Sequence, residues 1–327
     1  MKRIAALMLS LLMALSLFAC GSDSTADPTA APSAEQTPET TYSPVSFQNH
    51  GKRSTVNQLP QKAVTAGPNC TEIFCALGLE DKVIGKCMEN HSLGALEEYA
   101  DAVESIPTLS VGYPTAEEII DSGCDFIYAS SWIFDDDLTV AQLEKAGITV
   151  YVSEAETLSA LWQDMRDLAK IFEVDNIESI ISEQATRLEA ITAKLGDVAD
   201  ADAKKVFVLD SFVGDKPYTA GAANIETAYI SAAGGENIFG DDITKAWDAV
   251  DSAEVAAADP WYIIIHDYQG SSYDDKVAAL KADPVLSQLD CVKNERFIRI
   301  SLEDALPGIR AVSTIETIAQ ALYPDNF

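Results

Sequence analysis

The chain of 327 residues has little basic charge and very little histidine. It contains 22 Lys and Arg residues against 52 Asp and Glu residues, which gives a net charge of −30. A field of this sign repels phosphate backbones and anionic lipid headgroups, so we expect no nucleic-acid partner and no charge-driven membrane binding; solubility alone is an alternative explanation. The three histidines are His50, His91 and His266. They are too few for a transition-metal site of several imidazoles, which weighs against a bare zinc or manganese cargo.

Motifs of catalysis are also missing. The sequence has no Walker-A loop, no dinucleotide-binding glycine pattern, no Gly-x-Ser-x-Gly turn and no His-Glu-x-x-His pair. We therefore expect a protein that is not an enzyme and that holds no cofactor. Six cysteines are present without a Cys-x-x-Cys pair. Those after Cys20 lie mostly in apolar stretches, which predicts small buried side chains rather than zinc ligands; the sequence leaves open whether they are free or paired.

Long hydrophobic runs are confined to the N-terminus. After Lys2 and Arg3, residues 4–17 form an apolar run interrupted only by two serines. As a helix this run would rise about 21 Å, less than the ~30 Å hydrocarbon core of a bilayer, so it predicts a signal peptide over residues 1–19. The segment Leu-Phe-Ala-Cys-Gly that follows resembles the lipobox of bacterial lipoproteins. This resemblance implies cleavage before Cys20 and acylation of its thiol; a plain signal peptide or an uncleaved anchor is the alternative.

The composition changes after the lipobox. Residues 20–61 are rich in Ser, Thr, Ala, Pro and Glu and show no periodic apolar face. Such a segment cannot bury enough surface to offset the entropy of ordering it. We predict a disordered tether of about 40 residues with a reach of about 30–40 Å, which would let a folded body find a partner near the membrane.

The remaining sequence alternates short strands with helices. Strand-like segments separated by helical patterns predict parallel, helix-covered sheets. In mid-chain two amphipathic helices follow each other without a strand, and the second covers 177–195. We therefore predict an α/β fold of two Rossmann-like lobes joined by a single long α-helix, with a ligand cleft between the lobes. The predicted parts are an N-terminal lobe (62–174), a linking helix (175–196) and a C-terminal lobe (197–327); one large doubly wound sheet is the alternative.

Candidate ligand-binding residues follow the ends of predicted strands, where open α/β sheets bind ligands. His91 and His266 each follow a strand in a different lobe, and as a pair they could contact a metal chelate from two sides. Loop aromatics suit a large, flat ligand, and a loop arginine could pair with a carboxylate. Ordinary packing or an internal salt bridge is the alternative for each residue, and we expect no direct metal ligand. The candidates are Asn69, His91, Tyr113, Trp132, Phe134, Tyr218, Trp247, His266, Tyr268 and Arg310.

Several motifs together resemble the substrate-binding lipoproteins of ABC importers for iron–siderophores, haem or vitamin B12. They span roughly 62–325 and read PNCTEIFCALG, DKVIG, PTAEEI, AAGGENI and DPWYII, with Trp247 between the last two. The resemblance implies a rigid two-lobed fold joined by one helix, with the ligand held between the lobes. It also implies a permease and its ATPase as partners, an extracytoplasmic location and a membrane contact through the lipid alone; we expect a monomer.

The ligand class stays open within this resemblance. A metal chelate is expected, a ferric siderophore first, with cobalamin, another corrinoid or haem as alternatives. A sensor or adhesion lipoprotein, or a cofactor-dependent enzyme on the same frame, is the alternative from another class.

The resemblance further implies two acidic residues, one per lobe, that contact arginines of the permease. Glu117 matches the first, seven residues before Cys124, where the family has a proline. Glu254 is the candidate for the second, but it precedes Pro260 by six residues, and Ala253 occupies the matching place. The second docking residue is therefore open, and both acids could simply favour the start of a helix.

Overall fold

The computed structural model describes residues 42–196 and 203–327. The predicted signal peptide (1–19), Cys20 and the first half of the predicted tether lie outside the described residues. Within these two ranges, no helix combines the length and the apolar character that a membrane crossing requires.

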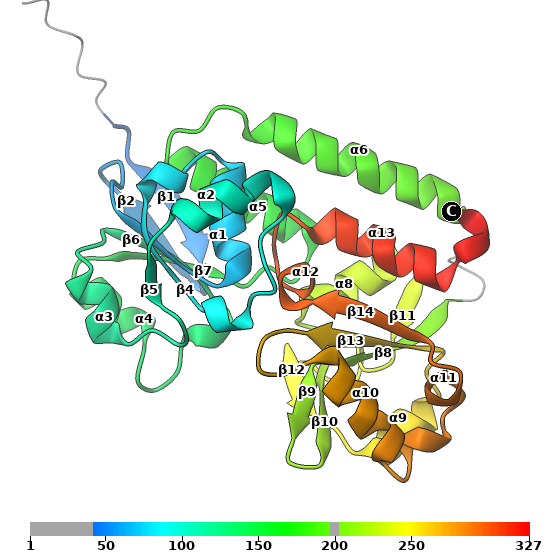
Figure 1. Cartoon of the computed structure of the whole chain (residues 1–327). Coiled ribbons are helices and arrows are strands. Elements are labelled where there is room, and N and C mark those ends of the chain that lie inside the picture. Colours follow the sequence, from blue (N-terminus) through cyan, green and yellow to red (C-terminus); the bar gives the residue numbers. More distant parts are fainter. Residues whose placement is uncertain (1–41, 197–202) are drawn as a thin grey trace, which may run out of the picture. The chain divides into compact units, whose positions relative to one another are not determined.

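Within residues 42–196, the N-terminal lobe is built on a five-stranded parallel sheet in the order β5-β4-β3-β6-β7 (Figure 1). Its strands are β3 (Ala63–Ala66), β4 (Val83–Cys87), β5 (Thr108–Ser110), β6 (Phe126–Ser130) and β7 (Thr149–Ser153). Its helices are α1 (Pro68–Ala76), α2 (Ala100–Ser105), α3 (Ala116–Asp121), α4 (Val140–Lys145) and α5 (Leu158–Ile171).

Side chains of this sheet point alternately to its two faces, and a separate hydrophobic core lies on each face. Phe126 and Tyr128 of β6 pack on one face with residues of α1 and α5, whereas Ile127 and Ala129 pack on the other face with residues of α3 and α4. Successive side chains of a strand point to opposite faces, so a strand buried on both faces reads as a continuous apolar run. This is why FIYA, rather than an alternating pattern, marks the centre of the sheet.

A β-hairpin precedes the first strand of the sheet, within the segment predicted as a disordered tether. Strands β1 (Val45–Asn49) and β2 (Lys52–Val56) pair in antiparallel register. The ring of Phe47 is buried and stacks on Tyr151 of β7 with centroids 5.0 Å apart. The prediction of disorder over 20–61 is therefore wrong for the hairpin. Its composition is polar because only Phe47 and Val56 are buried in the core, while Asn49 exchanges two hydrogen bonds with the backbone of Val152, at 2.8 and 2.6 Å.

Within residues 203–327, the C-terminal lobe holds a four-stranded parallel sheet in the order β11-β8-β13-β14 and a small antiparallel sheet in the order β12-β10-β9. The strands are β8 (Lys204–Leu209), β9 (Ser211–Val213), β10 (Lys216–Ala220), β11 (Gly235–Asn237), β12 (Trp247–Ala249), β13 (Tyr262–Asp267) and β14 (Phe297–Ser301). The helices are α8 (Ile225–Ala232), α9 (Ser252–Ala258), α10 (Tyr273–Ala282), α11 (Asp290–Lys293), α12 (Leu302–Ala305) and α13 (Ala311–Leu322).

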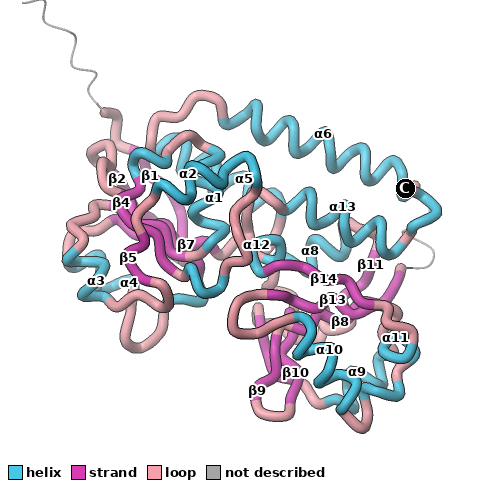
Figure 2. The backbone as a smooth tube through the Cα atoms, viewed as in Figure 1, coloured by secondary structure: helices cyan, strands magenta, loops and turns pink. Residues whose placement is uncertain are grey.

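One long helix, α6 (Ile177–Leu195), runs from the N-terminal lobe to the C-terminal lobe, where it lies beside α13 (Figures 1 and 2). Its buried residues, among them Ile181 and Ile191, form one stripe along the helix. Within the described ranges, no strand of one parallel sheet pairs with a strand of the other. The predicted α/β fold of two lobes joined by one long helix is therefore confirmed.

Candidate functional site

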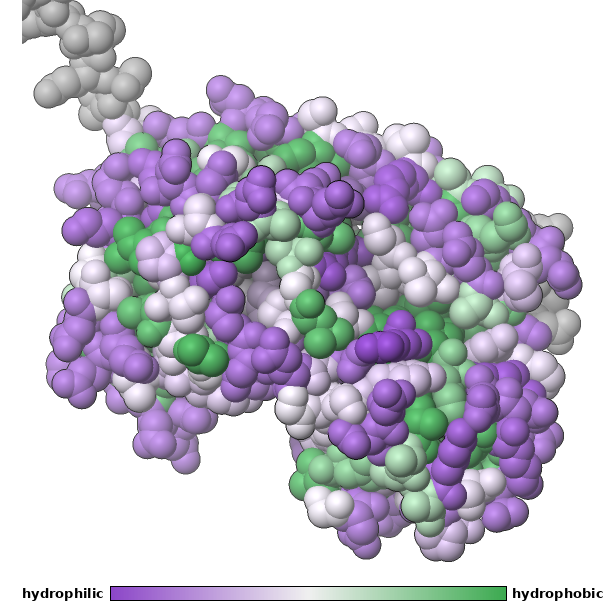
Figure 3. Space-filling model, in the orientation of Figure 1, coloured by the Kyte–Doolittle hydropathy of each residue, from purple (hydrophilic) through white to green (hydrophobic). Residues whose placement is uncertain are grey.

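Two adjoining cavities lie between the lobes, and the face drawn in Figure 3 is indented where the lobes meet. We call the first, of about 280 Å³, the aromatic cavity; it is lined by His91, Tyr113, Trp132, Asp210, Tyr218, Trp247, Tyr268, Leu302 and Leu306. We call the second, of about 330 Å³, the polar cavity; its lining includes Ser130, Ser131, Ser153, Glu154, Glu156 and Asn224. Trp132, Trp247 and Leu306 line both cavities, so the two form one continuous cleft.

The topology explains how residues from distant parts of the chain reach one cavity. Trp132 follows β6, Asp210 follows β8 and Tyr268 follows β13 directly. The carboxyl ends of parallel strands meet at one edge of each sheet, and these edges face each other across the cleft. Tyr218 and Trp247 come instead from the small antiparallel sheet, where their rings stack with centroids 5.8 Å apart.

Aromatic rings connect the two lobes at this site. His91 lies 5.4 Å from Trp132 and 5.8 Å from Tyr113, measured between ring centroids, so three rings of the N-terminal lobe form one cluster. The ring of Tyr268, from the other lobe, stacks on His91 at 5.7 Å with an interplanar angle of 12°. Six of the ten residues predicted from the sequence to bind the ligand line the aromatic cavity: His91, Tyr113, Trp132, Tyr218, Trp247 and Tyr268.

A chain of charged groups lies at the C-terminal wall of this cavity. His266 is fully buried, with Nδ1 3.0 Å from Asp210 and Nε2 2.9 Å from Glu226. Burial opposes protonation of His266, but the two carboxylates outweigh it and raise the pKa of the imidazole to about 9. Burial likewise opposes ionisation of Asp210, but the hydrogen bond and charge of His266 outweigh it and lower the pKa of this carboxyl. At neutral pH the cavity therefore faces an ionised Asp210, which His266 holds in place from behind.

His266 itself does not line either cavity, contrary to the prediction that it contacts the ligand. The side chain at the end of β13 turns into the lobe because two acidic side chains, Asp210 and Glu226, bind both ring nitrogens there. Sequence reasoning identified the histidine at the strand end and missed Asp210, which reaches the cavity. The signal was present, since Asp210 directly follows the buried strand β8.

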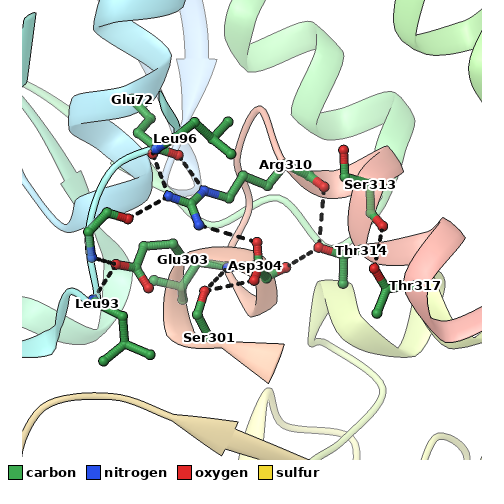
Figure 4. A network of polar contacts seen from close by, with 12 residues as sticks. Glu72, Leu93, Leu96, Ser301, Glu303, Asp304, Arg310, Ser313, Thr314 and Thr317 are labelled. Atoms are coloured by element: carbon green, nitrogen blue, oxygen red, sulfur yellow. Dashed lines mark hydrogen bonds and ion pairs between the residues drawn. The ribbon is translucent and has the colours of Figure 1, made fainter. Parts of the chain in front are cut away.

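Arg310 is not free to bind a ligand carboxylate, contrary to the prediction. Its side chain is 9 % exposed, and the guanidinium donates to both oxygens of Glu72 in α1, at 2.7 and 2.6 Å (Figure 4). It also donates to the carbonyl oxygen of Gly94 at 2.8 Å, and the neighbouring Glu303 accepts the backbone N–H of Leu93 at 2.7 Å. These contacts run from the C-terminal lobe to the N-terminal lobe. The alternative of an internal salt bridge is the one that the structure shows.

Asn69 and Phe134 also lie outside the two cavities. Asn69 is 1 % exposed; it donates to the carbonyl oxygen of Pro307 at 2.7 Å and accepts from Ser130 at 2.9 Å. The Asn69 amide therefore links the two lobes behind the polar cavity. Because its nitrogen and its oxygen both already have partners in the chain, it is not free to bind a ligand. Phe134 packs against the core between the N-terminal sheet and the α3–α4 layer, so ordinary loop packing describes it.

The two acidic docking candidates occupy different positions on their helices. Glu117 is the second residue of α3 and is exposed, while the third residue, Glu118, accepts the backbone N–H of Thr115 at 2.7 Å. In α9 the third residue, Glu254, accepts the backbone N–H of Asp251 at 2.8 Å. Glu254 is thus the counterpart of the capping Glu118, and Ala253 holds the place of Glu117.

The described cysteines and acidic groups offer no metal site. Cys70, Cys75, Cys87, Cys124 and Cys291 are free and buried. Burial raises the pKa of Cys70 and Cys87 to about 12, so these thiols are inert at neutral pH. Within residues 42–196 and 203–327, no group of three or more His, Cys, Asp or Glu side chains is placed to hold a metal ion.

Two α/β lobes joined by one helix, with an aromatic cleft between them, define a bilobal solute-binding protein. The profile of the periplasmic binding protein family matches residues 64–302, and the chain belongs to this family. This confirms the resemblance found in the sequence.

Relatives and solved structures agree with this assignment. An uncharacterized ABC transporter substrate-binding lipoprotein, YvrC of Bacillus subtilis, is 24 % identical over 334 residues, covering 100 % of this chain and 99 % of its own. A cobalamin-binding protein of Halobacterium salinarum is 24 % identical over 215 residues, which are 64 % of this chain and 55 % of that protein. The crystal structure of a periplasmic binding protein from Veillonella parvula is 26 % identical, with a TM-score of 0.73 over 86 % of this chain and 98 % of its own.

Proposed function

We propose that this protein is the lipid-anchored substrate-binding component of an ABC importer, and that it delivers a bulky metal chelate to a membrane permease and its ATPase. The observation that carries the proposal is the aromatic cavity, to which both lobes contribute and across which His91 stacks on Tyr268. A solute held there contacts both lobes at once, so its affinity depends on the relative orientation of the two lobes. Binding and release, without turnover, are the whole task of the protein.

The cleft suits a solute of chelate size. The cavities of about 280 and 330 Å³ share Trp132, Trp247 and Leu306, and taken together their volume falls within the range of about 300–1,000 Å³ typical of ligand sites. Aromatic walls bind flat or amphipathic faces, and the polar cavity supplies hydroxyl and amide groups for the periphery. Ferric siderophores are the first ligand class; corrinoids are the second candidate, favoured by the cobalamin-binding relative.

The remaining parts of the proposal concern anchoring and docking. Cys20 carries the lipid, which holds the protein at the outer surface of the cell membrane. The protein acts there as a monomer. Glu117, exposed on the first turn of α3, contacts an arginine of the permease. Glu254 is a second docking candidate, although its carboxylate already caps α9.

The test is a binding titration on the mature chain with Cys20→Ser, which removes the acylated thiol. Trp132 and Trp247 line the cleft, so a bound chelate should quench the tryptophan fluorescence. Ferric siderophores, cobalamin and haem are titrated separately, and we expect saturable quenching with a micromolar or lower Kd by at least one of them. Quenching by none would overturn the proposal. A sensor or adhesion role would instead predict normal chelate uptake in cells that lack this protein.

A further inference from the structure

The charge of the cleft lining is of one sign. Among the described residues that line the two cavities, the acidic side chains are Asp210, Glu154 and Glu156, and no lysine or arginine is present. Glu154 is paired with His50 at 2.9 Å, whereas Asp210 lines the aromatic cavity directly. The anionic character of the chain as a whole, with a net charge of −30, acts in the same direction.

The cationic groups nearest to Asp210 are held behind the cavity wall. His266 divides its two N–H groups between Asp210 and the fully buried Glu226, so its charge is shared by two carboxylates. The Nζ atom of Lys276 donates to the carbonyl oxygen of His266 at 2.7 Å and lies 4.1 Å from the ring centroid of Tyr268. Arg299 forms an ion pair with Asp267. None of these cations lines either cavity. They partly compensate the charge of Asp210 from behind, whereas the side of the carboxylate that lines the aromatic cavity meets no lysine or arginine.

The other walls of this cavity are aromatic faces. Tyr113, Trp132, Tyr218, Trp247 and Tyr268 line the cavity together with Asp210. The ring of Tyr268 is already in contact with His91 and Lys276, so the other four rings are the ones that can contact a cation. Aromatic faces attract a cation within about 6 Å of their centroids, most strongly where water is excluded. His91 adds a further ring but no charge of its own: burial lowers the pKa of its imidazole, although Asp210 acts in the opposite direction. A ring of aromatic side chains around one carboxylate is an arrangement that favours an organic cation over a neutral or anionic group.

We propose that the aromatic cavity is a cation site, in which Asp210 is the counter-ion and the surrounding rings are the walls for an ammonium group or a positively charged chelate. This inference rests on the proposed function and deepens it, because it assigns the charge class of the cargo. Chelates whose surface is anionic, such as catecholate complexes, or ligands that carry free carboxylates, such as haem, lack a cationic partner in this lining.

The first experiment measures charge selectivity with two probes of matched shape. Choline and its uncharged isostere 3,3-dimethylbutan-1-ol are titrated by tryptophan fluorescence into the mature chain with Cys20→Ser. We expect choline to bind roughly tenfold more tightly, since the two differ only in the charge that the rings and Asp210 attract. Equal affinity, tighter binding of the isostere or binding of neither probe would overturn the inference.

The variant Asp210→Asn assigns the selectivity to one side chain. Asparagine keeps an acceptor for His266 Nδ1, so it removes the charge and leaves the hydrogen bond. We expect the preference for choline to fall to about twofold or less, and selectivity that survives this change contradicts the inference. The matched control is Asp215→Asn, the same loss of charge at an exposed residue that lines neither cavity. Should Asp210→Asn unfold the chain, Tyr113→Leu replaces it, because Tyr113 is 55 % exposed and its removal costs little packing; it should weaken choline more than the isostere.

A second pair of probes separates this inference from the proposed function. Ferrioxamine B carries a pendant ammonium group, and its N-acetyl derivative is the same chelate without that charge. If siderophores, corrinoids or haem bind in the panel but choline and ferrioxamine B have no advantage over their neutral counterparts, the cation site is wrong and the importer function stands. If choline binds in an Asp210-dependent manner and no chelate binds, the chelate function is wrong and the cation site stands.

Discussion

The imidazole of His91 stacks on the phenol ring of Tyr268, with centroids 5.7 Å apart and planes 12° apart. One ring belongs to the 3₁₀ turn Glu89–His91 that follows β4, and the other follows β13, so the pair joins the lobes directly at the ligand cavity. The strength of this stack therefore influences both the closed arrangement of the lobes and the affinity for a solute between them.

The replacement His91→Leu should weaken ligand binding without unfolding the chain. Leucine fills the space but offers no flat face to Tyr268, and an aromatic pair contributes about 0.5–1.5 kcal/mol beyond the area that it buries. We expect the Kd of the bound chelate to rise by roughly 3- to 10-fold, measured by fluorescence quenching. His91→Phe is the control, since it keeps a ring for stacking. An unchanged Kd in His91→Leu would mean that the stack has no part in binding.

The salt bridge between Glu72 and Arg310 should be a major stabilising contact between the lobes. Glu72→Gln removes the closer, two-point partner of a buried guanidinium and leaves it Asp304 at 3.4 Å. The complete loss of one partner of a buried pair costs about 3–5 kcal/mol, so we expect a smaller loss, of about 2–3 kcal/mol. Urea denaturation should show this loss as a lower midpoint. The double variant Glu72→Leu/Arg310→Met is the control, because it removes both charges of this pair together, although Asp304 then loses its contact with Arg310. A double variant no more stable than Glu72→Gln would contradict this explanation.

The distance between these two partners along the chain shows what sequence reasoning could not supply. Glu72 and Arg310 are 238 residues apart, so nothing local to Leu306–Arg310 indicates that the arginine is already paired. The lobes, the long helix and the aromatic lining were predictable because they follow local rules: buried strands, an amphipathic stripe and loops after strand ends. Asp210 was missed although it directly follows β8 and so met the same strand-end rule, because only histidines, aromatic residues, one asparagine and one arginine near strand ends were considered as ligand contacts.

The hairpin β1–β2 was missed because each strand buries only one apolar residue, and the polar contacts that also hold it, such as those of Asn49 with the backbone of Val152, have no local sequence signal. Phe47→Ala should release it: replacing a buried phenylalanine by alanine costs about 3–5 kcal/mol when the whole fold must absorb the loss. Because few elements pack on the hairpin, we expect it to detach from the N-terminal lobe while the free energy of unfolding of the whole chain falls by less than this amount. Limited proteolysis should then cut between residues 42 and 61 in the variant and not in the wild type. Gln48→Ala, at an exposed position of the same strand, is the control.

The pH dependence of stability should report the charge of His266. Its pKa is raised to about 9 in the folded chain from 6.5, so its contribution is complete below pH 6.5 and declines as the pH rises. Lys276 acts in the opposite direction as the pH approaches and passes 8, because burial lowers the pKa of its amine to about 8. Between pH 6.5 and 8 we expect the free energy of unfolding to fall by about 1 kcal/mol.

Urea denaturation at three pH values in this window measures the effect. The groups that face the imidazole are Asp210, Glu226 and, through its contact with the His266 carbonyl oxygen, Lys276. In His266→Gln the side chain cannot be charged, so the slope should disappear while the unfolding midpoint is lower at every pH. A wild-type slope that persists in this variant would assign the proton to another group.

Permease docking should depend on Glu117 and much less on Glu254. The carboxylate of Glu117 is exposed on α3, with no capping partner, whereas Glu254 caps α9 through the backbone N–H of Asp251. Glu117→Ala should therefore lower the stimulation of the transporter's ATPase several-fold while the Kd for ligand and the unfolding midpoint stay unchanged. Glu254→Ala should cost about 1 kcal/mol of stability, as the loss of a helix cap does, with little effect on ATPase stimulation.

The matched control for both variants is Glu118→Ala. Glu118 neighbours Glu117 on the same turn but caps α3, as Glu254 caps α9, so its removal separates loss of a cap from loss of a docking charge. ATPase stimulation is measured with ligand-loaded protein and the reconstituted transporter. If Glu117→Ala and Glu118→Ala reduce stimulation equally, the stability of α3, and not the exposed charge, is what the permease requires. If Glu254→Ala has the larger effect, the C-terminal lobe uses its capping residue for docking despite the shift by one position.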